Sequence, residues 1–372
     1  MPKIIDLFAG AGGLSLGAAR AGFTVVAAVE LDDFAIGTHK KNFPASKHLQ
    51  HDISKISGKK LLELAGLKAG ELDGLIGGPP CQGFSTIGKR QVDDARNDMF
   101  SHFFRLVKAT SPAFFVAENV TGILNSQYDS VRNKALSVLP KKYVLLEPFK
   151  VKASEHGAPT TRTRVFFIGY DPKKMKGRLN QADFVPSTEV GKVLVKEALL
   201  GLPKEISSDW LTEEQGWRKI DHSQLLKTSF FERITGAIPK NIGNKKFIER
   251  YQNNGLVSGC MGTKHSQEVE ARYAALGYGE QDPISKSMRL NPEGFCPTLR
   301  AGTGSDKGSF QAVRPIHYNA ARVITPREAA RLQGFPDWFV FHATKWHSFR
   351  QIGNSVSPIV AESILTSIFK KY

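Results

Sequence analysis

The chain has 372 residues, 41% of them hydrophobic and 23% charged, which is the balance of a globular protein long enough for two lobes. It has no run of 18 apolar residues, no charged segment before a long apolar one, and only three scattered cysteines without a CxxC pair. We therefore expect no membrane span, signal peptide, disulfide framework or structural metal, and residence in the cytoplasm. The net charge of +16 predicts a polyanionic partner, with nucleic acid favoured over an anionic membrane.

The first 30 residues predict a βαβ unit that binds a nucleotide. Residues 3–8 and 24–29 are short apolar runs typical of strands, and a glycine turn and a small-residue helix over 16–22 separate them. Gly10 and Gly12 would let backbone approach a ligand, and Glu30 would accept hydrogen bonds from ribose hydroxyls. Ser15 stands where a dinucleotide fingerprint has its third glycine. This disfavours NAD and FAD and leaves adenosine-type cofactors such as S-adenosylmethionine.

A second acid and a cysteine follow at further predicted strand ends. Helices are expected over 34–43 and 59–67, and Asp52 lies between them as either a ligand-binding acid or a turn residue. The apolar run 72–76 leads into Gly-Gly-Pro-Pro-Cys81-Gln-Gly-Phe-Ser85, a stiff turn followed by a polar loop. Loops of this kind carry catalytic groups disproportionately, so Cys81 is a candidate nucleophile, although a lone cysteine is more often an inert buried side chain.

Charged residues also flank the next two predicted strands. Glu118 follows the apolar run 113–117, where burial would favour a protonated carboxyl, unless it only caps the following turn. Arg162 and Arg164 precede a buried strand and share one face, because alternate strand residues do. Two convergent guanidiniums suit a phosphate or a polarised carbonyl, and a solvated edge strand is the alternative.

From about residue 171 the charge, Asn and Gly content rise and periodicity falls, which predicts a second, irregular lobe. Residues 297–308 are rich in glycine, hydroxyls and basic side chains that could contact phosphates or bases. Thr325, Pro326 and Glu328 mark the start of a helix over 325–334. A last helix is expected over 359–369.

These segments, in this order, resemble the motifs of the DNA cytosine-C5 methyltransferase family. The matching sequences are Asp-Leu-Phe-Ala-Gly-Ala-Gly-Gly from residue 6, Gly-Pro-Pro-Cys-Gln-Gly-Phe-Ser from 78, Glu-Asn-Val from 118, Arg-Thr-Arg from 162, Arg-Glu-Ala-Ala-Arg-Leu-Gln-Gly-Phe-Pro from 327 and Gln-Ile-Gly-Asn-Ser-Val from 351. The resemblance spans nearly the whole chain, with a variable gap at about 175–295. Leu31 is a departure, because an aromatic residue often follows the ribose-binding acid in this family.

The resemblance implies an α/β, Rossmann-like S-adenosylmethionine-dependent methyltransferase fold with a second, smaller, irregular target-recognition domain. The expected division is residues 1–174 for catalysis and cofactor binding, 175–349 for target recognition, and 350–372 as a helix returning to the catalytic domain. The implied reaction is methyl transfer to C5 of cytosine in a specific sequence of duplex DNA, within a restriction-modification system. The alternatives are a tRNA methyltransferase with the same chemistry and a catalytically silent DNA-binding paralogue.

The resemblance also assigns individual roles. Cys81 would attack cytosine C6, Glu118 would donate to N3, Arg164 would bind O2, and Arg162 would position Cys81, all on a flipped-out base. Cofactor contacts are expected from Phe8, Gly10, Gly12, Glu30, Asp52, Pro79 and Asn354. DNA contacts are expected from Gln82, Ser85, Lys89, Arg90, Arg96 and Arg300. We expect a monomer without a metal that acts on double-stranded DNA, and a cognate restriction endonuclease that acts separately.

Overall fold

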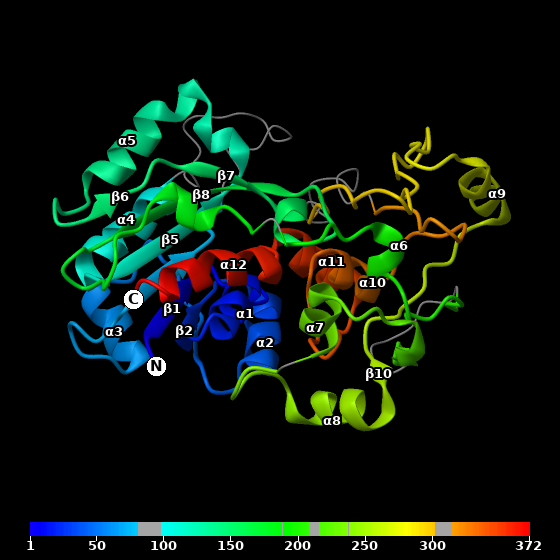
Figure 1. The fold of residues 1–372 in the computed structure, drawn as a ribbon, viewed down its shortest axis with the longest axis horizontal. Coiled ribbons are helices and arrows are strands. Elements are labelled where there is room, and N and C mark those ends of the chain that lie inside the picture. The colour runs from blue at the N-terminus through cyan, green and yellow to red at the C-terminus, as the bar shows by residue number, and fades with distance from the viewer. Residues whose placement is uncertain (81–97, 188, 208–215, 237, 302–313) are drawn as a thin grey trace.

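The computed structural model describes residues 1–80, 98–187, 189–207, 216–236, 238–301 and 314–372. Its described part contains an eight-stranded mixed sheet that runs in the order β3-β2-β1-β4-β5-β8-β6, with β7 also pairing with β8 (Figure 1). The strands are β1 (Lys3–Leu7), β2 (Thr24–Val29), β3 (Lys47–Leu49), β4 (Gly74–Gly77), β5 (Phe114–Asn119), β6 (Val144–Leu145), β7 (Phe149–Lys152) and β8 (Thr163–Tyr170). The strands from β3 to β5 are parallel, and β8 runs antiparallel to β5. The predicted Rossmann-like α/β fold is confirmed.

Alternation along the strands sends side chains into two cores, one on each face of the sheet. Ile4 belongs to the core that also holds α1 (Gly13–Arg20) and α12 (Pro358–Phe369). The next residue, Ile5, belongs to the core beneath α3 (Gly58–Ala65) and α4 (Asp98–Thr110). This is the period-2 pattern of a strand that is buried on both faces, as in a parallel sheet covered by helices.

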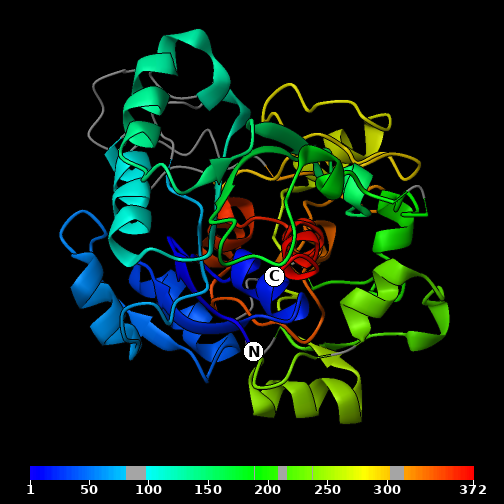
Figure 2. The same ribbon diagram turned by 60° about the vertical axis from the view of Figure 1, so that its left-hand side comes forward.

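The last helix packs beside the first. In both ribbon views α12 lies next to α1, and the two termini lie near each other (Figures 1 and 2). A Cβ atom built on Gly17 of α1 would lie only 2.3 Å from the Ala361 Cβ, so the close approach of the two helices requires glycine. The C-terminal helix thereby lies against the helix that follows the glycine turn.

One stretch, Lys345–Phe369, has the length and composition of a membrane-spanning helix, with 25 residues and a mean hydropathy of 1.2. In the fold it forms α11 (Lys345–Asn354) and α12, with Ser355–Ser357 between them. The apolar side chains of α12 are buried in the core that it shares with α1. The stretch therefore serves the packing of the protein interior, and length with composition alone is weak evidence for a span.

The remaining described elements form an irregular lobe around α10 (Pro326–Leu332). They are α6 (Val195–Ala198), β9 (Arg218–Lys219), α7 (Ser229–Thr235), α8 (Lys245–Asn254), β10 (Leu256–Val257) and α9 (Gln267–Ala275), while α2 (Asp33–Asn42) and α5 (Asp129–Ser137) belong to the sheet half. The expected domain division stays a prediction. The larger core cluster runs through all three predicted parts, and the boundary at residue 350 falls inside α11.

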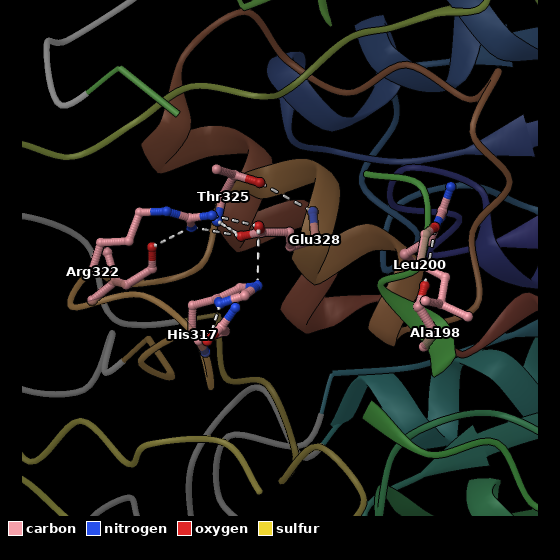
Figure 3. Close-up of polar contacts among 9 residues, drawn as sticks. Ala198, Leu200, His317, Arg322, Thr325 and Glu328 are labelled. Carbon is pink, nitrogen blue, oxygen red and sulfur yellow. Dashed lines mark hydrogen bonds and ion pairs between the residues drawn. The ribbon is translucent and has the colours of Figure 1, made fainter. Parts of the chain in front are cut away.

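Helix α10 confirms the start signals that the sequence carries. The Thr325 hydroxyl accepts a hydrogen bond from the Glu328 amide at 3.2 Å, and the Glu328 carboxylate accepts one from the Thr325 amide at 2.7 Å. Glu328 also binds the guanidinium of Arg322 through both oxygens and lies 3.7 Å from His317 (Figure 3). These contacts fix the backbone that leads into α10. The irregular lobe is therefore arranged around a helix whose start is held in place.

Candidate active site

A cavity of about 380 Å³ opens at the carboxyl ends of the parallel strands. The strand order reverses between β1 and β4, and this is the point where open α/β sheets bind ligands. The described residues that line the cavity come from the turn after β1, the starts of α1 and α2, the ends of β2, β4 and β5, the start of β8, and α11 with the residues after it: Phe8, Ala9, Gly10, Ala11, Gly13, Leu14, Glu30, Asp32, Ala35, Gly78, Pro79, Pro80, Glu118, Val120, Arg162, Arg164, His347, Arg350, Gln351, Gly353, Asn354, Ser355 and Val356.

The predicted glycine turn forms one wall of this cavity. Phe8, Gly10 and Gly12 all have positive φ, at 57°, 56° and 104°. A Cβ atom on Gly12 would lie 2.3 Å from the Phe43 ring, so this position is closed to larger residues. Phe8 and Gly10 line the cavity, whereas Gly12 is not among the described lining residues and packs against Phe43.

Glu30 ties the glycine turn to the end of β2. Its carboxylate accepts hydrogen bonds from the backbone amides of Gly10 at 2.9 Å, Leu31 at 2.8 Å and Asp32 at 2.9 Å. Burial raises the pKa of Glu30, and these three amides act in the opposite direction. A carboxylate has about four lone-pair sites, so it can still accept from a ribose hydroxyl.

A buried polar chain lies behind the turn, and sequence reasoning missed it. The Ser15 hydroxyl donates to Asp6 at 2.6 Å and lies 3.0 Å from the His39 Nε2 atom. His39 Nδ1 lies in turn 3.0 Å from His48 Nε2. Ser15, which looked like a missing glycine, is therefore a hydrogen-bonding residue in its own right.

The buried carboxyl of Asp6 should make the free energy of unfolding depend on pH. Burial raises its pKa from 3.8 to about 7, the Ser15 hydrogen bond lowers it, and Glu30 raises it further. A carboxyl with a raised pKa in the folded state contributes stability that is complete below pH 3.8 and lost as the pH rises through about 7. Between pH 5 and about pH 7 this decline amounts to about 3 kcal/mol, and we expect Asp6→Asn to remove it. Denaturant unfolding of both proteins at pH 5 and pH 8 measures it, and an equal decline in the two would contradict the assignment.

The end of the cavity that carries the predicted catalytic residues lies at β5 and β8. Glu118 is 7% exposed, and its Oε1 atom lies 2.9 Å from the Arg164 Nε atom. Asn119 donates to the Pro79 carbonyl at 3.3 Å, which fastens the Pro-Pro turn to β5. Cys81 follows this turn directly in the chain but lies outside the described residues. The turn ends at Pro80, which lines the same cavity as Glu118 and directly precedes Cys81 in the sequence.

Arg162 and Arg164 both line the cavity but make different contacts. The Arg162 guanidinium donates to the Gly353 carbonyl of α11 at 2.9 Å. The backbone amide of Ala301 lies only 2.6 Å from a Cβ atom built on Gly353. The carbonyl carbon of Arg300 also lies 2.6 Å from this Cβ position, so the backbone of Arg300 itself packs against Gly353 of the cavity wall, while the residue is exposed.

The other expected site residues fall into three groups. Pro79 and Asn354 line the cavity. Asp52 is not among the described lining residues, and its carboxylate accepts from the Ser54 amide and hydroxyl at 2.9 and 2.7 Å, which is the turn role that the sequence left open. Gln82, Ser85, Lys89, Arg90 and Arg96 lie outside the described residues.

The cavity fits an adenosine-type cofactor. Its volume lies within the range of about 300–1,000 Å³ that ligand sites have. It combines a glycine turn, a ribose-type acid and an exposed Asn354 at its wall. In the part of the chain that the structure describes, no group of His, Cys, Asp and Glu side chains could hold a metal ion.

Comparisons with known proteins agree with this geometry. The family model for C-5 cytosine-specific DNA methylases matches residues 2–370. The chain is similar to the Type II methyltransferase M.XorII of Xanthomonas oryzae pv. oryzae, at 38% identity over 99% of this chain and 85% of that protein. It is 32% identical to M.DdeI of Desulfomicrobium norvegicum, over 98% and 88% of the two chains.

A solved structure agrees as well. It is an E. coli protein described as a DNA modification methyltransferase encoded within a prophage, at 50% identity and a TM-score of 0.90, covering 100% of this chain and 99% of that one. The fold, the cavity and these matches together lead to one assignment. The chain belongs to the C-5 cytosine-specific DNA methylase family and is a DNA cytosine-5-methyltransferase of the restriction-modification type.

Proposed function

We propose that the protein transfers a methyl group from S-adenosylmethionine to C5 of cytosine in a specific sequence of duplex DNA, through a covalent bond between Cys81 and cytosine C6. The observation that carries this proposal is the continuity of the cavity. It joins the glycine turn and Glu30 at one end to Glu118, Arg162, Arg164 and the Pro79-Pro80 turn before Cys81 at the other. A methyl donor and a base held in this cavity would therefore meet beside Cys81.

The chemistry of cytosine explains why these residues are needed. C5 is a poor nucleophile until a thiolate adds to C6, which turns the ring into an enamine with electron density at C5. Bound S-adenosylmethionine supplies a methyl group on a sulfonium, which is a good leaving group. Loss of the C5 proton and elimination of Cys81 then restore the aromatic ring. None of the reacting atoms is accessible in a stacked duplex, so the base must leave the helix at a cost of a few kcal/mol.

Glu118 and Arg164 supply the charge that this addition requires. Attack at C6 places negative charge on N3 and O2, and a carboxyl proton and a guanidinium are suited to these two atoms. Without substrate the two side chains contact each other at 2.9 Å. We infer that cytosine inserts between them, that its O2 accepts a hydrogen bond from the Arg164 guanidinium, and that the Glu118 carboxyl, which takes up a proton from solvent, donates that proton to N3.

Arg162 acts as a positioning residue beside Glu118 and Arg164. Its bond to the Gly353 carbonyl fixes it between β8 and α11, so it can orient the Cys81 loop without touching the base. The basic loop residues Lys89, Arg90 and Arg96 would contact phosphates, and Gln82, Ser85 and Arg300 would lie nearer the bases. We propose that the protein acts in the cytoplasm as a monomer, and that a cognate restriction endonuclease acts separately.

A duplex that contains 5-fluorocytosine tests the covalent step. Fluorine replaces the C5 proton that must leave, so methylated enzyme–DNA complexes should accumulate and resist denaturation. A Cys81→Ser variant should form none, and unmodified tRNA should accept no methyl group from the parent protein. Normal methyl transfer by Cys81→Ser, or transfer to tRNA alone, would contradict the proposal.

A further inference from the structure

The cavity wall contains few rings that could face a cofactor base. Among the described residues that line it, only Phe8 and His347 carry an aromatic side chain. Leu31, at the position where the family often has an aromatic residue, is 62% exposed and does not line the cavity. An aromatic face for the adenine ring, in addition to that of Phe8, must therefore come from a residue other than Leu31.

His347 lies at the nucleoside end of the cavity. Its helix, α11, is joined to the start of α2 by an ion pair between Arg350 and Asp32 at 2.8 Å. The Gln351 side chain adds a hydrogen bond to the Phe34 carbonyl at 2.9 Å. Asp32 in turn donates its amide to the Glu30 carboxylate. These contacts place His347 on the side of the ribose-type acid, away from Glu118.

The His347 ring is held by three neighbouring rings. Its centroid lies 3.8 Å from that of Phe34 at an interplanar angle of 35°, 4.5 Å from that of His342, and 4.6 Å from that of Trp346. A ring in such a cluster has little rotational freedom, so stacking of a ligand on it costs little further side-chain entropy. The imidazole is therefore preorganised.

We infer that His347 positions the cofactor, with its imidazole supplying the second aromatic face for the adenine ring that Leu31 does not supply. The inference rests on the proposed S-adenosylmethionine site and assigns a residue to it. Phe8, from the glycine turn, supplies the other face. Since stacking on an aromatic side chain contributes to the binding of a base, loss of this ring should weaken cofactor binding about tenfold.

Calorimetric titration of the full chain with S-adenosylhomocysteine tests the inference. We expect His347→Ala to raise the Kd about tenfold, and His347→Phe to retain the parent Kd within about twofold. Leu31→Trp in the His347→Ala background should restore binding. His51→Ala removes an exposed histidine that does not line the described cavity and should leave the Kd unchanged.

The outcomes separate the two proposals. A parent Kd in His347→Ala would overturn the role of His347 while leaving the cofactor site intact. A parent chain that fails to bind S-adenosylhomocysteine would overturn the cofactor site itself. Rescue by Leu31→Trp in the His347→Ala background distinguishes a stacking role from a merely structural one, because a ring added at position 31 could not restore an unfolded or collapsed site.

Discussion

Replacing Glu118 with glutamine is expected to lower kcat by about 10²- to 10⁴-fold, the usual contribution of a positioned acid or base. Glutamine keeps the shape of the side chain and can donate a hydrogen bond, but it cannot share a proton with cytosine N3. Binding of S-adenosylhomocysteine should change little, because Glu118 lies at the opposite end of the cavity from Glu30 and Asp32. Single-turnover methylation of duplex DNA with saturating cofactor measures the effect.

Asp129→Asn is the matched control for this charge change. Asp129 lies at the exposed start of α5, where it pairs with Arg132 outside the described cavity wall, so its loss should leave kcat within about twofold. Equal rates for the parent protein and Glu118→Gln would show that the buried contact between Glu118 and Arg164 contributes to the fold and not to the reaction.

The second large effect concerns the ion pair between Arg331 and Asp337, whose side chains are both fully buried. Arg331 also donates to the carbonyls of Ala198 and Leu200, so it joins α10 to the segment around α6. Asp337→Ala would leave this guanidinium buried without its counter-charge. We expect the free energy of unfolding to fall by about 3–5 kcal/mol. Denaturant titration measures it.

Two further variants distinguish the loss of this buried ion pair from the loss of any charged residue. Glu63→Ala breaks the exposed pair with Lys60 and should cost less than about 1 kcal/mol. The double replacement Arg331→Met with Asp337→Leu should recover much of the lost stability, because it removes both buried charges. A loss no larger for Asp337→Ala than for Glu63→Ala would contradict the role given to this pair.

Local signals explain which elements could be predicted from the sequence. The start of α10 is encoded within four residues, since Thr325 and Glu328 accept hydrogen bonds from each other's amides and Pro326 has no amide hydrogen to satisfy. The βαβ unit is likewise local. By contrast α8 was missed, although Asn244 caps its start and Gly255 ends it in the left-handed conformation, because its composition looked like that of an irregular segment.

Contacts between distant residues explain what the sequence could not supply. The link from Ser15 to His39 and the ion pair from Asp32 to Arg350 form only when separate elements pack together. Asp52 shows the opposite problem, because an acid after a strand fits a ligand site and a turn equally well until its partner Ser54 is seen. Motifs predict the reacting groups, but the cavity walls around them depend on tertiary packing.

The central claim, methyl transfer to cytosine C5 in DNA by Cys81, is tested most directly by bisulfite sequencing of DNA from cells that express the chain. The account predicts cytosines protected from conversion at one recurring sequence with the parent protein, and none with Cys81→Ser made at the same level. Full conversion of the DNA with the parent protein, or equal protection by the Cys81→Ser variant, would contradict it.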